Sequence, residues 1–454
     1  MTHVCRYWRG AIASSQSNWT YIDSRWRQLA PLCLEHAGAA PLTVTISVPD
    51  LELSALEYLC GHRKGSLPWA QAHLRDFLQA LFPHAARISH LSLSVYPPIE
   101  RVVDVHPDFF ASAPDLTSLE FKNRLEPAKW FPSKEAPMPS LFRNVSKLVS
   151  LHLANAPLYP TLFNIASLVE LKFVGHKIYF QSFIEFLESN HSLETVVLEL
   201  TFVKSSVLTA PGRKASLPRL RRLTLTCGYP IDARGLLSCL SFSRGVKIVI
   251  QESEPGRSCG DLALFLPSPP TPIQDLLAPI TTIKSWHWWI YISGNDGSFS
   301  FQSSTNPQKS NQEYDLFDTG TVRQVHMQDC TPYGRIGPDD KKSWPLECLP
   351  ALEVLIISGP RQGPGPIAAL AKDPTLCPSL KTIALLDHME SPEAFRELES
   401  MLTEQENSTA ARLHRIVIAN KRRDMPDQVR SVVRLRELVR QVDIIVGQDL
   451  PDLL

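Results

Sequence analysis

A spaced trio of apolar residues recurs along this chain and constrains its fold more than any other feature. Each trio has two residues between its first and second members and one residue between its second and third. Members two apart point to the same side of a strand, and the first lies where the chain turns into that strand, so all three should point inward. The ten trios are Ile88, Leu91, Leu93; Leu116, Leu119, Phe121; Leu148, Leu151, Leu153; Leu168, Leu171, Phe173; Leu193, Val196, Leu198; Leu220, Leu223, Leu225; Val322, Val325, Met327; Leu352, Leu355, Ile357; Leu380, Ile383, Leu385; and Leu413, Ile416, Ile418.

The interval between trios is close to that of a repeat protein. Their first members lie 28, 32, 20, 25 and 27 residues apart in one block and 30, 28 and 33 apart in a second. One such unit cannot bury its apolar side alone, so neighbouring units must stack and pair their strands in parallel. The pattern predicts an α/β fold, an irregular leucine-rich-repeat solenoid with parallel strands on its concave face and helices and loops outside.

The expected repeats lack one regular feature. Common leucine-rich repeats carry Asn or Cys three residues after the last apolar member of the trio. Among the ten trios, only Cys330 occupies that position here. We therefore expect an irregular array with uneven curvature.

Other segments show the spacing of helices and of a further strand. Apolar residues recur on one helical face between the trios, and in the last such segment the stripe continues through Val442. Gly38 is expected to end the first helix. The expected helices are 25–37, 70–82, 391–402 and 428–442, and the expected strand is 41–48.

The middle of the chain departs from the repeat. Residues 251–279 are polar and rich in proline, which predicts a loop, whereas 280–303 predict two strands around a turn at Gly294–Gly297. Residues 302–320 are polar. Aromatic side chains gather in the first of these strands, and the alternatives are an exposed partner-binding patch or a strand covered on both faces. The patch residues are Trp286, Trp288, Trp289 and Tyr291.

Composition and missing motifs narrow the function classes. The 454 residues carry no net charge, which argues against a nucleic-acid partner. Nine scattered Cys residues include no C-x-x-C pair, so we expect no metal site and no cofactor. Phosphate-loop, serine-elbow and zinc-helix motifs are also missing, so we expect no enzyme. No leader and no membrane-spanning apolar run occurs, which predicts a cytoplasmic or nuclear protein without a membrane partner.

The N-terminal sequence resembles a known interaction domain. Residues 3–23, HVCRYWRGAIASSQSNWTYID, are similar to the C-terminal half of an F-box-like domain, of the type expanded in mushroom-forming fungi and followed there by irregular leucine-rich repeats. The specific segments are Val-Cys-Arg-x-Trp and Trp-Thr-x-Ile-Asp. The matching residues, expected to be F-box core or adaptor-facing, are Val4, Cys5, Trp8, Ile12, Trp19 and Ile22.

The resemblance implies a substrate-recognition subunit of a Skp–cullin–F-box ubiquitin ligase, with a Skp-type adaptor and an unknown protein substrate as partners. The N-terminal half of the F-box is missing from the match, so an adaptor-independent scaffold or a degenerate paralogue is the alternative. The expected parts are a truncated F-box-like helical segment (1–40), one repeat block (41–250), an irregular insertion with an aromatic hairpin (251–320), and a second repeat block with a C-terminal cap (321–454).

One set of residues would form the concave surface of the expected solenoid. They lie between the second and third members of each trio and so point away from the core. Their chemistry is mixed and has no charge bias, so they do not identify a ligand. They are Ser92, Glu120, His152, Lys172, Val197, Thr224, His326, Ile356, Ala384 and Val417.

Overall fold

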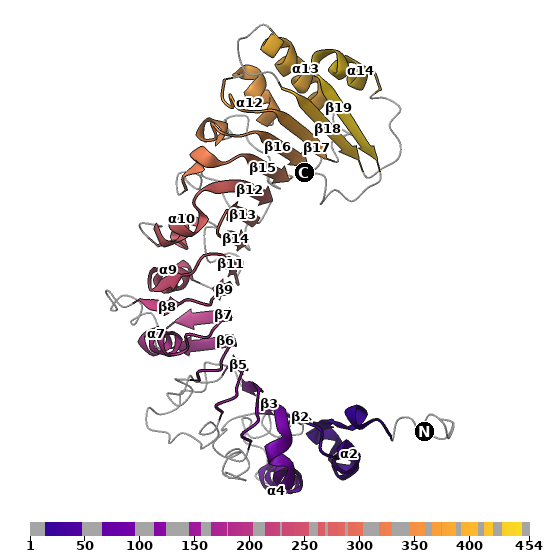
Figure 1. Ribbon diagram of the computed structural model, residues 1–454, viewed down its shortest axis with the longest axis vertical. Helices are drawn as coiled ribbons and strands as arrows, with labels where there is room; N and C mark the ends of the chain where they lie inside the picture. Colours follow the sequence, from indigo (N-terminus) through magenta and orange to yellow (C-terminus); the bar gives the residue numbers. More distant parts are fainter. Residues whose placement is uncertain are drawn as a thin grey trace. The chain divides into compact units, whose positions relative to one another are not determined.

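The protein is α/β, with helices beside a large, mostly parallel sheet that contains 17 strands of the described residues (Figure 1). The chain divides into two compact units, which are described separately. Unit 1 comprises 1–226 and 239–243, and unit 2 comprises 227–238 and 244–454. The computed structural model describes residues 14–47, 66–95, 113–123, 145–155, 165–178, 180–202, 214–227, 229–253, 262–267, 271–286, 289–302, 317–328, 345–358, 366–373, 375–386, 392–406, 413–420 and 429–446.

The strands of unit 1 lie side by side in chain order. All the pairings from β1 to β7 are parallel. Their register aligns the trios, because Leu119, Leu151 and Leu171 are consecutive partners across β4, β5 and β6. The strands are β1 (Tyr21–Asp23), β2 (Leu42–Ser47), β3 (Ile88–Val95), β4 (Ser118–Asn123), β5 (Ser150–Ala154), β6 (Glu170–Ile178), β7 (Thr195–Phe202) and β9 (Arg222–Cys227).

Helices of unit 1 pack against the side of the sheet that carries the trios. The ring of Phe173, a trio residue in β6, lies 6.3 Å from the ring of Phe183 in α7. The expected first helix is two pieces, η2 and α2, and it ends at Gly38 as predicted. The helices are η1 (Gln16–Trp19), η2 (Ser24–Leu29), α2 (Ala30–Ala37), α4 (Ser66–Leu81), η3 (Phe82–Arg87) and α7 (Phe180–Ser189), and β8 (Ala215–Leu217) pairs with β10 (Leu240–Phe242).

The sheet of unit 2 contains an antiparallel segment. Within its described strands, β13 alone runs against its neighbours, and the others are parallel to one another. Trp289 and Trp286 are backbone partners where β13 meets β12. In spatial order the strands are β11 (Lys247–Glu252), β14 (Ser298–Gln302), β13 (Trp289–Gly294), β12 (Ile280–Trp286), β15 (Gln324–Gln328), β16 (Val354–Ser358), β17 (Thr382–Leu386), β18 (Arg415–Asn420) and β19 (Gln441–Val446).

The middle of the chain is more regular than its composition predicts. The expected loop over 251–279 contains η7 (Leu262–Leu264) and α10 (Thr271–Leu277), so that prediction was wrong. Ile273, Leu276 and Leu277 are buried, and their spacing places them on one side of a helix. The hairpin turn lies where expected, since the Gly294 amide donates to the Gly297 carbonyl at 3.1 Å. The first of the two expected strands is divided into β12 and β13.

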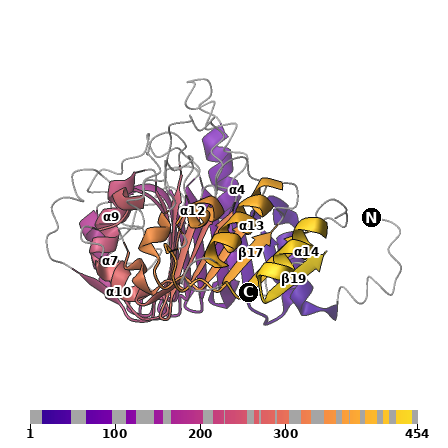
Figure 2. The same ribbon diagram turned by 90° about the horizontal axis from the view of Figure 1, so that it is seen from above.

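Helices α12, α13 and α14 of unit 2 lie together on one side of β16–β19 (Figure 2). The expected helix over 428–442 ends earlier, at Leu438, and Val442 belongs to β19 as the partner of Ile416. The run Val-Asp-Ile-Ile-Val favours a strand, because β-branched residues fit a sheet better than a helix. The helices are α9 (Pro230–Ser238), α12 (Pro366–Lys372), α13 (Pro392–Glu406) and α14 (Val429–Leu438), with η8 (Thr319–Thr321) and η9 (Pro345–Cys348).

Every one of the 30 trio residues is buried, and none is more than 5% exposed. This confirms their inward orientation. The structure adds a fourth buried position, three residues before each trio, which we call the turn position. Its carbonyl accepts the amide of the first trio member at 2.9–3.3 Å. Its occupants among the described residues are Ala85, Ala113, Val145, Ile165, Asn190, Leu217, Thr319, Leu349 and Cys377.

Asn190 is the one amide side chain among these occupants, and it is fully buried. Its Oδ1 accepts the backbone amide of Ile165, the turn position of the preceding repeat, at 3.0 Å. Its Nδ2 donates to the carbonyl of Phe186 in α7 at 2.7 Å. Buried polar groups are stable only when hydrogen-bonded, so Asn190 fixes one repeat to the next and to its helix.

Candidate protein-binding surface

Each sheet has an outward face, formed by the residues that alternate with the trio members and point away from the helices. In unit 1 the middle of this face is a row of consecutive strand partners: Ser92, Glu120, His152 and Lys172. The first three are half-buried and Lys172 is exposed. The predicted outward residues are therefore brought into one line by the parallel register.

Glu120 is the centre of a polar network in this row. Its Oε2 accepts the Ser92 hydroxyl at 2.6 Å, and its Oε1 lies 2.8 Å from His152 Nδ1 and 2.7 Å from Lys122 Nζ. Burial would raise the pKa of Glu120, but the hydrogen bonds from Lys122 and Ser92 hold it below its usual value. The carboxylate is thus ionised and already satisfied within the row.

His152 is half-buried beside Glu120 in this row. Burial lowers the pKa of its imidazole, although the charge of Glu120 opposes that shift. The ring is therefore neutral near pH 7. An ionised carboxylate only accepts hydrogen bonds, so Nδ1 carries the proton and donates to Glu120. Nε2 is then a hydrogen-bond acceptor. Lys172, the strand partner of His152, adds a cation beside that acceptor.

The corresponding row of unit 2 begins with an aromatic and cationic patch. Tyr291, Lys284 and His326 are consecutive partners across β13, β12 and β15. The ring of Trp289 stacks on that of Tyr291 at 5.6 Å, and Lys284 Nζ lies 5.9 Å from the centre of the Tyr291 ring. Both rings are half-buried. Aromatic rings of this kind are frequent anchors at protein interfaces.

Two of the four predicted patch residues, Trp289 and Tyr291, are thus brought together. For Trp286 the structure gives the backbone position in β12, and Trp288 lies outside the described residues. Ile290 and Ile292 are buried, on the side of β13 opposite Trp289 and Tyr291.

Beyond His326 the outward row of unit 2 becomes apolar. Ile356, Ala384 and Val417 continue the row, and Leu386 and Ala419 lie beside them towards the carboxyl ends of the strands. These five buried residues, which we call the apolar strip, form a hydrophobic cluster of their own. The sequence carried a signal for it, because VLII, IALL and IVIA are continuous apolar runs, typical of strands buried on both faces.

The N-terminal segment that resembles an F-box-like domain is partly described. Ile22 is buried in β1 as the partner of Val44, and the ring of Trp19 lies 4.7 Å from that of His36 in α2. Both residues therefore serve the packing of unit 1. The other predicted residues of this segment, Val4, Cys5, Trp8 and Ile12, lie outside the described residues.

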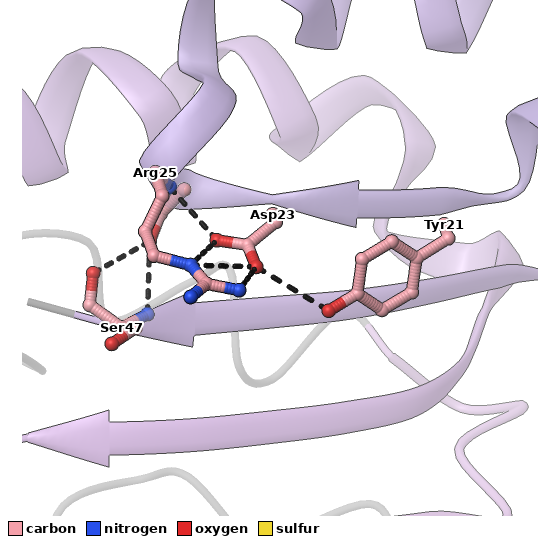
Figure 3. A network of polar contacts seen from close by, with 5 residues as sticks. Tyr21, Asp23, Arg25 and Ser47 are labelled. Carbon is pink, nitrogen blue, oxygen red and sulfur yellow. Dashed lines mark hydrogen bonds and ion pairs between the residues drawn. The ribbon is translucent and has the colours of Figure 1, made fainter.

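Asp23, at the end of the same segment, anchors a polar network (Figure 3). Its buried carboxylate accepts the Arg25 guanidinium, with Nε to Oδ1 at 3.0 Å, and also the Tyr21 hydroxyl at 3.3 Å. Burial would raise the pKa of Asp23, but Arg25 holds it below its usual value. Beside it, the Ser24 hydroxyl donates to the Ser47 carbonyl at 2.7 Å, which ties the segment to β2.

The described residues offer no metal cluster of three or more His, Cys, Asp or Glu side chains. Burial raises the pKa of the Cys227 and Cys377 thiols to about 12, so neither is a thiolate nucleophile at neutral pH. Within the same part of the chain, no helix has the length and apolar character needed to span a membrane.

Comparison with known proteins adds no relative. No protein-family model matches the chain, and no curated protein matches it.

Proposed function

We propose that the protein is an interaction module that binds another protein through the outward faces of its sheets. The observation that carries the proposal is the alignment of outward residues across parallel strands into continuous rows. Such a row gives a partner several side chains at the spacing of the strands, about 4.8 Å. In unit 1 the row supplies Lys172 and the His152 acceptor, and in unit 2 it supplies the stacked rings of Trp289 and Tyr291.

The finer architecture that we propose is an irregular leucine-rich-repeat solenoid. It is supported by the burial of all ten trios and by their alignment in register across parallel strands. The recurrent turn position supports it further, because every repeat whose turn is described enters its strand through the same hydrogen-bonded turn. Most trios lack the Asn or Cys that common leucine-rich repeats carry three residues after the last apolar member. Among the described repeats, Asn190 makes a buried hydrogen bond between repeats from the turn position instead.

A role as the substrate-recognition subunit of a Skp–cullin–F-box ligase is the more specific form of this proposal. Its support is the resemblance of residues 3–23 to part of an F-box-like domain. The test is co-purification of the chain with a Skp-type adaptor, with and without a complete F-box segment fused upstream. Association only with the fused segment would assign the role to a longer protein, and no association with either would refute ligase membership.

The second candidate is a scaffold that binds partners without an adaptor. The burial of Ile22 in β1 and the packing of Trp19 on His36 favour it, because side chains used inside the fold are not available to an adaptor. This candidate predicts partner binding that is unchanged by adding or removing a Skp-type adaptor.

A photo-crosslinking residue tests the outward face itself. Placed at the exposed Lys172, it should capture partner proteins from cells. The matched control is the same residue at Asp76, which is exposed on helix α4. Trp289→Ala or His152→Ala is then combined with the crosslinker at position 172. Loss of the captured proteins would show that the replaced residue contributes to binding the same partner. Equal capture from Lys172 and Asp76 would refute the proposed surface.

A further inference from the structure

The last strand of unit 2, β19, lies at the end of its sheet (Figure 1). Val439, Val442 and Ile444 have the same spacing as the ten trios and form an eleventh. Val442 is the backbone partner of Ile416, and Ile444 is that of Ile418, so this trio continues the inward rows of β18. Among the described strands, β18 alone pairs with β19. The edge of β19 away from β18, which we call the open edge, therefore ends the described sheet of unit 2.

The eleventh trio differs from the others in its exposure. Val439 is 6% exposed, Val442 is half-buried, and Ile444 is 37% exposed, whereas none of the other trio residues exceeds 5%. Terminal repeats of such arrays need a polar outer surface to stay soluble, and an edge strand offers unpaired amide and carbonyl groups to other strands. An apolar side chain that is exposed at the open edge therefore marks a surface on which a further strand can pack.

The helix beside the open edge is basic. Helix α14 carries three arginines and one carboxylate, Glu437. Arg434 Nη1 lies 3.9 Å from Glu399 Oε2 of α13, which identifies the flank of α14 that faces α13. Arg436 is about 200° further round the helix, on the opposite flank, and it is exposed. Arg440, also exposed, immediately precedes β19, so a second cation lies at the amino end of this strand.

The carboxylate of β19 does not offset these cations. Asp443 lies on the outward side of the sheet as the partner of Val417, and its Oδ2 accepts Arg415 Nε at 2.6 Å. The open edge thus combines apolar side chains with uncompensated positive charge. A second copy of this chain would bring the same arginines together, and like charges oppose such pairing. An acidic segment of a different protein complements both the charge and the apolar row.

We propose that β19 is an acceptor for an extended segment of another protein, which adds a strand beside Val442 and Ile444 and presents an acidic residue to Arg440. Apolar residues at alternate positions of that segment continue the inward row. Its backbone pairs with the amide and carbonyl groups of β19 that point away from β18. The acceptor is the edge of the sheet and not its outward face, so this inference does not rest on the proposed function.

A defined peptide tests the acceptor edge. The probe is fluorescein-labelled SETVTIS, in which one acidic and two β-branched apolar residues alternate with threonine. Its fluorescence anisotropy should saturate as the full chain is added, and hydrogen exchange of the amides of 441–446 should slow when it is bound. The control peptide SETSTSS should bind roughly tenfold more weakly or worse, because both apolar side chains are removed. Absence of saturable binding by SETVTIS, or slower exchange only outside 441–446, would overturn the proposal.

A charge reversal tests the role of Arg440. Arg440→Glu should weaken binding of SETVTIS roughly fivefold, and the peptide SKTVTIS should recover that loss. The matched control is Arg396→Glu, an equally exposed position on α13, which should leave the affinity unchanged. Equal affinities of the two variants for SETVTIS would show that Arg440 does not contact the acid. Sedimentation equilibrium of the chain alone gives a further check, because a dimer that Ile444→Lys dissociates would assign the edge to a second copy and overturn the proposal.

Discussion

Replacing Asn190 by alanine removes a contact that joins two neighbouring repeats. The side chain is fully buried, and it accepts the Ile165 amide at 3.0 Å while donating to the Phe186 carbonyl at 2.7 Å. Alanine can do neither, and the space left is too enclosed for bulk water to restore both bonds. The two backbone groups would then stay buried without these partners.

The size of the loss follows from those two groups. A buried donor or acceptor left without a partner costs about 1–3 kcal/mol. A carbonyl oxygen has two lone pairs and loses only one partner here, so the share of the Phe186 carbonyl lies at the lower end. We therefore expect Asn190→Ala to lower the free energy of unfolding by about 2–5 kcal/mol. Asn190→Leu restores apolar volume, as at Leu217, but still strands the Ile165 amide and should cost about 1–3 kcal/mol.

Urea unfolding followed by far-ultraviolet circular dichroism measures these losses. His191→Ala is the control, because its side chain is exposed and its replacement should change the unfolding free energy by less than about 0.5 kcal/mol. The reasoning would be refuted if Asn190→Leu were as stable as the unchanged protein. That result would mean that the turn position needs only apolar volume and that the two hydrogen bonds contribute nothing net.

Three further changes test other parts of the description. Leu151→Ala should cost about 2–5 kcal/mol, whereas Val149→Ala, 42% exposed, should cost less than about 0.5 kcal/mol; similar losses in urea unfolding would contradict the inward assignment. Gly294→Ala should cost about 1–3 kcal/mol, because a Cβ there would collide with the Leu277 carbonyl, and an unchanged thermal midpoint would exclude that collision. Burial lowers the pKa of His326 from 6.5 to about 4, so the unfolded chain takes up a proton that the folded chain does not as pH falls through that window. The free energy of unfolding should therefore fall by about 1–2 kcal/mol between pH 6.5 and pH 4, after allowance for solvent screening. Urea titrations at several pH values measure this fall, and His326→Gln should remove the part that His326 contributes.

The repeat could be predicted from the sequence because its signal is periodic. Leu151 and Leu153 are followed by equivalents at a near-constant interval, and parallel pairing is the arrangement that buries them all. The turn position was not predicted, because its occupants range from Ala113 to Asn190 and Thr319 and share no side-chain chemistry. What they share is a backbone hydrogen bond, which a pattern of apolar residues does not contain.

Two other features escaped prediction for different reasons. Val442 fits both the apolar spacing of a helix and a run of β-branched residues typical of a strand. It lies in a strand because this segment pairs with β18. At Ile356 and Val417 the continuous apolar runs indicate burial on both faces, but the residues were assigned to the outward row from their place in the trio alone. The candidate surface was predicted in outline, since the outward row lies where expected. The Glu120 network was not, because it depends on the register between strands whose contacting residues are 28 and 32 positions apart.

The antiparallel strand of unit 2 has a consequence for how such a chain can change its length. Strand β13 runs against its neighbours, and β12 and β14 on either side of it run with β11 and β15. A hairpin pair such as β13 and β14 can therefore be gained or lost without reversing the direction of any later strand. The sheet stays parallel beyond the insertion, and each later crossover keeps its handedness and returns its helix to the same side. A repeat adds one parallel strand to this sheet, whereas a hairpin adds two strands at once. Either addition leaves the direction of the later strands unchanged.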